Sequence, residues 1–266
     1  MTTNPTSEEA RLAVNVFVSI DILGLLDHKE SRSADSIEEQ IKSYYLGLDI
    51  PENEPLKTIA KQQPLQEWDK EKKHYVFNSY WNVIIEQAHK NSKENYKVFS
   101  NSPAVQDILG KYVRLIASRG DTQGWKLAID KSDLITESNN VTYLTETYNL
   151  SIKAKPNQWI RWWGNSITPF CDIQCVVANI TTAGRPTKLE ELENEHYETT
   201  VYMYPSGSVG KTPPEYVTAQ SRAYSYIGQL KPGNSKKINY DITFHLVDHR
   251  GDIIAEFRVD PEIRVI

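Results

Sequence analysis

Residues 237–247 read KINYDITFHLV, and this stretch decides the fold class of the chain. Its apolar residues occupy every second position: Ile238, Tyr240, Ile242, Phe244 and Leu246. Polar or charged residues occupy the positions between them. An alternation of period two is typical of a β-strand that buries one face and exposes the other. The stretch therefore predicts a half-buried strand of an antiparallel sheet.

Strand signals recur on both sides of this stretch. Residues 12–22 (LAVNVFVSIDI) and 148–154 alternate in the same way, and residues 248–251 predict a turn into a last strand at 253–259. The chain also has 15 tyrosines and 6 tryptophans, which favour strands. We therefore expect a mainly β chain, folded as an antiparallel β-sandwich of jelly-roll or immunoglobulin-like type.

A block between the first strand and the later ones follows a different period. Segments 36–48, 74–97 and 102–120 carry apolar residues three and four positions apart, which is typical of helices. Ser102 and Pro103 form a typical helix start, and Gly120 is the expected stop. We expect a mainly helical insertion at 37–136, and a sandwich domain built from residues 1–36 and 137–266.

The insertion has two interpretations. Charged residues flank Tyr80, Trp81, Ile84 and Ile85, as they do in a solvated amphipathic helix that covers a core. The alternative is an element for oligomerisation or partner binding, because an exposed apolar patch on an added segment needs to be covered. The sequence leaves both open.

Composition excludes several classes of protein. The 266 residues carry a formal net charge of −5, which argues against a nucleic-acid-binding surface. No apolar run approaches the roughly 20 residues that span a bilayer. The start, MTTNPTSEEARLA, lacks the basic segment and the apolar segment that a secretory signal contains. We expect a cytoplasmic protein without a membrane partner.

Three stretches carry a family resemblance. VNVFVSIDI (14–22), NLSIKAKPNQWIRWW (149–163) and the C-terminal segment from 240 resemble the AidA/PixA-type inclusion-body proteins of bacteria. The closing Phe-x-x-Asp-Pro-x-Ile at 257–263 fits the same pattern, and so does the presence of only two methionines in the chain. The family passes from its first strand to the next within a few tens of residues, whereas about a hundred intervene here. The resemblance implies a compact sandwich that accumulates in cytoplasmic inclusions and is associated with stress or host-associated life. It implies no known catalytic residues, because the biochemical activity of the family is unsettled.

Residues 205–212, PSGSVGKT, look like a nucleotide-binding P-loop. The P-loop needs a glycine where Pro205 stands, and proline has no N–H and a fixed φ. Pro213 and Pro214 then follow where a helix should begin. We reject the NTPase interpretation and expect a plain loop between strands. The sequence has no Gly-x-Ser-x-Gly nucleophile elbow, and no carboxylate pair or Ser/His/Asp set can be identified from its spacing. A hydrolase is therefore only a low-ranking alternative.

The cluster QWIRWW at 158–163 is the main binding candidate. In a strand, Trp159, Arg161 and Trp163 lie on one face, where the guanidinium can stack against the indole rings. This face predicts either a platform for a carbohydrate or partner protein, or packing against the insertion. The sequence favours packing.

No metal site or disulfide is expected. His245 and His249 start about 13 Å apart in a strand and turn, which is too far for one ion. Asp21 and Asp260 are the remaining carboxylates considered for a cation, although such residues more often cap turns. Arg250-Gly251-Asp252 spells an adhesion tripeptide, but a hairpin turn explains its glycine.

The two cysteines, Cys171 and Cys175, are also too far apart in a strand for a disulfide. With Ile173 and Val177 they would share one core face.

The leading hypothesis is therefore a non-catalytic, self-associating inclusion-body or stress-associated protein that forms homo-oligomers and has no cofactor. The alternative is a lectin-like sandwich that binds carbohydrate or a protein through Trp159, Arg161 and Trp163.

Overall fold

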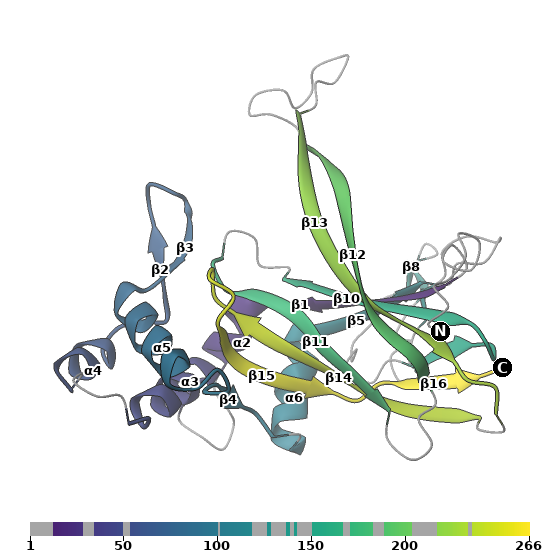
Figure 1. Ribbon diagram of the computed structural model, residues 1–266, viewed down its shortest axis with the longest axis horizontal. Helices are drawn as coiled ribbons and strands as arrows, with labels where there is room; N and C mark the ends of the chain where they lie inside the picture. The colour runs from purple at the N-terminus through teal and green to yellow at the C-terminus, as the bar shows by residue number, and fades with distance from the viewer. Residues whose placement is uncertain are drawn as a thin grey trace.

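The computed structural model describes most of the chain, and it is mainly β. The described residues are 13–28, 35–49, 54–100, 102–118, 127–128, 137–138, 141–142, 151–166, 171–182, 189–203, 217–233 and 236–266. They form two six-stranded sheets, two small two-stranded sheets and several helices (Figure 1). Neither large sheet closes on itself, and the jelly-roll or immunoglobulin-like topology stays a prediction.

The first large sheet has the residues of the first predicted strand at its centre. Its order is β12 (Leu189–Met203), β13 (Val217–Leu230), β10 (Trp159–Ser166), β1 (Val14–Ile20), β5 (Val113–Ser118) and β6 (Leu127–Ala128). β1 pairs with β10 in parallel and with β5 antiparallel. Strand β1 is shorter than the expected 12–22, because Asp21 caps the next helix: its side chain accepts a hydrogen bond from the Gly24 N–H at 3.1 Å.

The second large sheet is built around the opening stretch of the sequence. Its order is β4 (Lys97–Val98), β15 (Ile253–Val259), β14 (Lys237–Val247), β16 (Glu262–Val265) and β9 (Ser151–Ala154), and β11 (Gln174–Thr182) pairs with the other edge of β14. The predicted strand and C-terminal hairpin are confirmed. The predicted wholly antiparallel arrangement is wrong, since β1–β10, β15–β4 and β16–β9 pair in parallel. Long connections make parallel pairs possible.

The two large sheets contact each other through aromatic and small side chains. The Trp162 indole N–H donates to the Tyr240 hydroxyl at 3.3 Å, and the two rings lie 5.7 Å apart. A Cβ added to Gly164 would lie 2.8 Å from the Val177 side chain, so β10 and β11 approach closely at this glycine. All five apolar residues of β14 that define its period are buried. The predicted inward face is therefore confirmed.

The helices gather beside the second sheet. They are α2 (Ile22–Asp27), α3 (Ile37–Leu46), α4 (Glu54–Ala60), α5 (Ser79–Asn91) and α6 (Pro103–Tyr112), with a small hairpin of β2 (Gln66–Asp69) and β3 (His74–Phe77). Figure 1 shows α3, α4, α5 and this hairpin at one end of the molecule. Strands β7 (Glu137–Ser138) and β8 (Val141–Thr142) form the other small sheet.

Helix boundaries within 37–136 differ from the prediction; α5, for example, ends at Asn91 and not at residue 97. The Ser102 cap is confirmed, since its hydroxyl accepts from the Val105 N–H, but α6 ends at Tyr112 and not at Gly120. Residues 113–118 form β5 because Val113, Leu115 and Ala117 are all buried beside β1. Residues 74–77 form β3 where a helix is expected. Segment 37–136 thus contributes β4, β5 and β6 to the two large sheets, whereas the domain boundaries themselves stay predictions.

The hairpin β12–β13 projects from the body of the molecule as a long arm (Figure 1). Strand β10 pairs with β13 only from Tyr226 to Gln229. Beyond that point, nine register pairs from Glu195↔Ser225 to Met203↔Val217 form a two-stranded ribbon. We call residues 195–203 and 217–225 the arm. No helix in the described part of the chain is long and apolar enough to cross a membrane.

Replacing Tyr240 by phenylalanine tests the contact between the sheets. The change leaves the buried Trp162 N–H without its acceptor, so we expect the free energy of unfolding to fall by about 1–3 kcal/mol in urea denaturation. Tyr80→Phe is the matched control, because Tyr80 is exposed. An equal effect of the two substitutions would show that the buried hydrogen bond does not stabilise the fold.

Candidate functional site

The turn between β14 and β15 is organised by the carboxylate of Asp248. This side chain is 0% exposed. Its Oδ1 accepts hydrogen bonds from the backbone N–H groups of Arg250 and Asp252, each at 2.9 Å. Gly251 has a φ of 87°, which few other residues adopt, so the predicted glycine turn is confirmed. The turn is therefore a rigid platform at the end of the hairpin.

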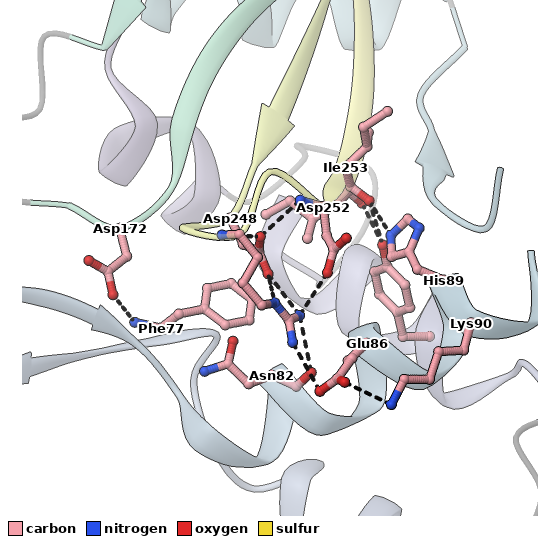
Figure 2. A network of polar contacts seen from close by, with 12 residues as sticks. Phe77, Asn82, Glu86, His89, Lys90, Asp172, Asp248, Asp252 and Ile253 are labelled. Carbon is pink, nitrogen blue, oxygen red and sulfur yellow. Dashed lines mark hydrogen bonds and ion pairs between the residues drawn. The ribbon is translucent and has the colours of Figure 1, made fainter. Parts of the chain in front are cut away.

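Arg250 joins this platform to helix α5. Figure 2 shows Asp248 and Asp252 of the turn facing Asn82 and Glu86 of α5. Its Nε and Nη2 donate to Asp248 Oδ2 at 3.1 and 2.9 Å, and Nη2 also lies 3.0 Å from Asp252 Oδ2. Nη1 lies 3.2 Å from Glu86 Oε2, and Nη2 donates to the Asn82 carbonyl oxygen at 3.3 Å. A planar guanidinium suits several acceptors at fixed angles better than a lysine does. Arg250 is thus committed to internal contacts, which argues against an adhesion role for the tripeptide at 250–252.

A second set of hydrogen bonds converges on the first residue of β15. The Ile253 carbonyl oxygen accepts from the Tyr45 hydroxyl at 3.1 Å and from His89 Nε2 at 2.8 Å. Burial raises the pKa of Tyr45 well above its usual value, so this hydroxyl stays protonated and donates. Helices α3 and α5 are both attached to the hairpin at this residue.

The β2–β3 hairpin is attached to the start of β11 in a similar way. Asp172 Oδ2 accepts from the Phe77 N–H at 2.9 Å, and His74 Nε2 lies 3.5 Å from the other carboxylate oxygen. The Cys171 thiol donates to Gln66 Oε1 at 3.0 Å. We call these contacts, with those of Arg250 and Ile253, the helix–sheet seam. Sequence reasoning missed the seam because its partners are far apart in the chain.

A pocket of about 580 Å³ opens beside Arg250. Glu86, His89, Lys90 and Lys93 line one side, and residues 251–253 line the other. Lys90 Nζ lies 2.8 Å from Glu86 Oε1. This hydrogen bond, with smaller help from Arg250, lowers the pKa of Glu86. The pocket therefore combines an ionised, paired carboxylate with basic residues on the last turn of α5 and just after it.

The predicted binding cluster lies on strand β10, and its three residues differ in exposure. Trp159 is 4% exposed and packs with Ala13 and Ile227. Arg161 and Trp163 are half-buried, and the Trp163 ring lies 5.7 Å from that of Phe17. Ligand binding by this cluster stays a prediction, with Trp163 and Arg161 as its accessible members.

The carboxylates considered for a cation occupy separate places. Asp21 caps α2, and Asp260 follows the end of β15, where burial raises the pKa of its side chain. His245 is paired with Glu256 at 3.2 Å, whereas His249 is exposed. Within the described residues, no group of three metal-ligating side chains is placed to hold an ion.

The P-loop-like segment falls at 204–216, which lies outside the described residues. The strands on either side of it, β12 and β13, pair antiparallel up to Met203↔Val217. A described strand therefore follows the segment from Val217.

Comparisons with solved structures yield weak similarities, and two of them are described here. No protein-family model and no curated protein matches the chain. The crystal structure of an inclusion body protein (PixA) from Burkholderia cenocepacia J2315 is similar over 98% of this chain and 100% of its own, with 8% identity and a TM-score of 0.40. The solution structure of Amebosin covers 44% of this chain and 90% of its own, with 8% identity and a TM-score of 0.17. Function has to be inferred from the residues of this chain.

Replacing Arg250 by alanine tests the seam. The change leaves the buried Asp248 carboxylate without its counter-ion, so we expect the free energy of unfolding to fall by about 3 kcal/mol in urea denaturation. Arg258→Ala on the same hairpin is the control, because Arg258 is half exposed and its ion pair should contribute under about 1 kcal/mol. If both changes cost the same, Arg250 does not hold the seam.

The two cysteines provide an independent check of the core. Both thiols are free and buried, and burial raises the pKa of each. Thiolates are the reactive form. With a disulfide reagent that releases a coloured thiolate, we expect no reaction of the native protein. In urea we expect both thiols to react. Rapid reaction of either thiol in buffer would place it at the surface.

Proposed function

We propose that this chain is a non-catalytic, self-associating protein of the inclusion-body type, and that its arm makes the contact between copies. The observation that carries the proposal is the two-stranded ribbon of nine register pairs. An isolated two-stranded hairpin is marginally stable in water at best. A third strand from another molecule would stabilise it.

Within the described part of the chain, both edges of the arm are unpaired. Among the described strands, none pairs with the outer edge of β12, and none pairs with β13 beyond Tyr226 except β12. Open edges present rows of backbone N–H and C=O groups to any chain that approaches. Proteins that add a strand to an exposed edge gain main-chain hydrogen bonds in this way.

Charge favours the β13 edge over the β12 edge. Within the arm, β12 carries Glu195 and Glu198, whereas β13 carries the single charged residue Arg222. Like charges brought together across strands destabilise pairing, and charged edges are a common protection against it. We therefore assign the contact to β13.

A second copy of the chain is the simplest partner for this edge. Antiparallel pairing of one strand with its own copy follows directly from a two-fold axis, the commonest symmetry of protein dimers. Each copy in such a dimer would keep its outer β12 edge unpaired by the dimer contact. The resemblance of β1, β9–β10 and β14–β16 to the AidA/PixA family supports accumulation in cytoplasmic inclusions.

The non-catalytic part of the proposal rests on how the polar groups are used. Asp248, Arg250, Glu86, His245 and Glu256 all make internal hydrogen bonds or ion pairs. Each of these groups has a partner within the fold, which gives it a structural role.

Carbohydrate binding at strand β10 is the second candidate. The observation that favours it is the half-buried Trp163 beside Arg161 and Phe17. A glycan array with the full chain, compared with Trp163→Ala, distinguishes it from self-association. A blank array would remove this candidate.

Shortening the arm tests the leading proposal. Residues 195–225 are replaced by Asn-Gly, because Asn194 lies opposite Tyr226 and such a turn closes two paired strands. We expect the full chain to show multimers in size-exclusion chromatography with light scattering, and the shortened chain to be a monomer that still unfolds cooperatively in urea.

A variant of the insertion serves as the matched control. Tyr80 and Val83 are exposed on α5, so Tyr80→Glu with Val83→Glu removes the apolar surface that could associate instead. We expect this variant to remain multimeric. A monomeric full-length chain, or multimers lost only in the α5 variant, would contradict the assignment of the contact to the arm.

A further inference from the structure

The register of the arm places different kinds of residue on its two faces. Every second residue of a strand lies on the same face, and residues directly opposite each other share a face. One face carries the opposite charges Glu198 and Arg222, which lie directly across from each other. The other face carries mainly apolar and small residues, and we call these the apolar face of the arm: Tyr197, Thr199, Val201 and Met203 from β12, and Val217, Ala219, Ser221 and Ala223 from β13.

The charged face suits water, and the apolar face suits a partner. Opposite charges directly across two strands stabilise their pairing, and Thr218 on the charged face is exposed. On the other side, the face is already covered where the arm leaves the body: Ser225 and Ile227 are 0% and 2% exposed. The nearest charge on that side is Glu195, opposite Ser225 at the root. An alternation of this kind is typical of strands with one face in water and one face packed.

The edge contact proposed for β13 fixes the direction of the two apolar faces in a dimer. A two-fold axis that exchanges neighbouring antiparallel strands stands perpendicular to their sheet. This rotation keeps each face of the sheet on its own side. The two arms then form one four-stranded sheet, with β12 and β13 of one copy followed by β13 and β12 of the other, and both apolar faces lie on the same side of it.

Area decides whether one arm or two paired arms can make a stable contact through this face. The nine register pairs give a face of roughly 300 Å² per arm, at about 3.3 Å per residue and about 4.8 Å per strand. Two single arms stacked on each other would bury only about 600 Å², below the roughly 1,000 Å² of a specific interface. Two four-stranded sheets would bury about 1,100 Å², which exceeds that threshold. Stacking therefore requires the edge contact to form first.

We infer that the apolar face of two paired arms binds the same face of a second dimer, so that four copies form a two-layer β-sandwich of arms. Sheets stack about 10 Å apart with their strands within about 30° of each other. The residues of the apolar face carry no charge, so two copies of it do not repel each other. Four copies arranged in this way have the symmetry of two crossed two-fold axes, which is common among tetramers. This second contact rests on the edge pairing proposed above.

Analytical ultracentrifugation of the full chain and of two lysine variants tests the inference. Ala219 belongs to the apolar face, whereas its neighbour Gln220 lies on the charged face of the same strand. Ala219→Lys and Gln220→Lys therefore add the same side chain to opposite sides of β13. We expect the unchanged chain and Gln220→Lys to form tetramers. We expect Ala219→Lys to lose the tetramer and stop at the dimer, because stacking would bury an unpaired ammonium group of each copy.

The possible results separate the two contacts. A dimer as the largest species of the unchanged chain, or tetramers that survive Ala219→Lys, would overturn the stacking and leave the edge contact in place. A monomeric unchanged chain would overturn both contacts. Equal loss of tetramers in Gln220→Lys would overturn the assignment to the apolar face. Urea denaturation shows whether each variant is folded, and Ala223→Lys on the same face replaces Ala219→Lys if that variant is not.

Discussion

The structure depends on the burial of one face of β14. This strand pairs with β11 on one edge and with β15 and β16 on the other, so both of its edges are used. Its apolar face lies against the first sheet, where Tyr240 accepts a hydrogen bond from Trp162. A strand held on both edges and one face has a fixed register, because a one-residue slip would expose every apolar side chain.

The turn that follows β14 is where the helices are attached to the sheet. The buried carboxylate of Asp248 accepts hydrogen bonds from two backbone N–H groups of its own turn and from the Arg250 guanidinium. A buried carboxylate is tolerated only with such partners. Arg250 also forms an ion pair with Glu86 on α5. The guanidinium that neutralises Asp248 in the turn therefore attaches the insertion as well. The pocket beside it follows from this geometry.

The arm and the helix–sheet seam make opposite use of polar groups. In the arm, no other described strand pairs with the outer edge of β12, and the proposal assigns the unpaired backbone groups of β13 to another strand. At the helix–sheet seam, by contrast, the carboxylates of Glu86, Asp248 and Asp252 are paired within the fold. The proposed self-association therefore involves other polar groups than those that hold the helices to the sheet.

Local periodicity was enough to predict β14, the C-terminal hairpin, β1 within two residues at each end, and the Ser102 cap, because each reflects contacts between near neighbours. The same reasoning failed where the fold overrides local preference: Val113–Ser118 continues a helical pattern but becomes a strand because β1 offers it an edge. It also could not find the Arg250–Glu86 ion pair or the pocket, whose partners are separated by 164 residues. The sequence alone determined which faces are apolar. Only the tertiary structure decided which of those faces meet, since pairing between distant segments depends on the packing of the whole chain.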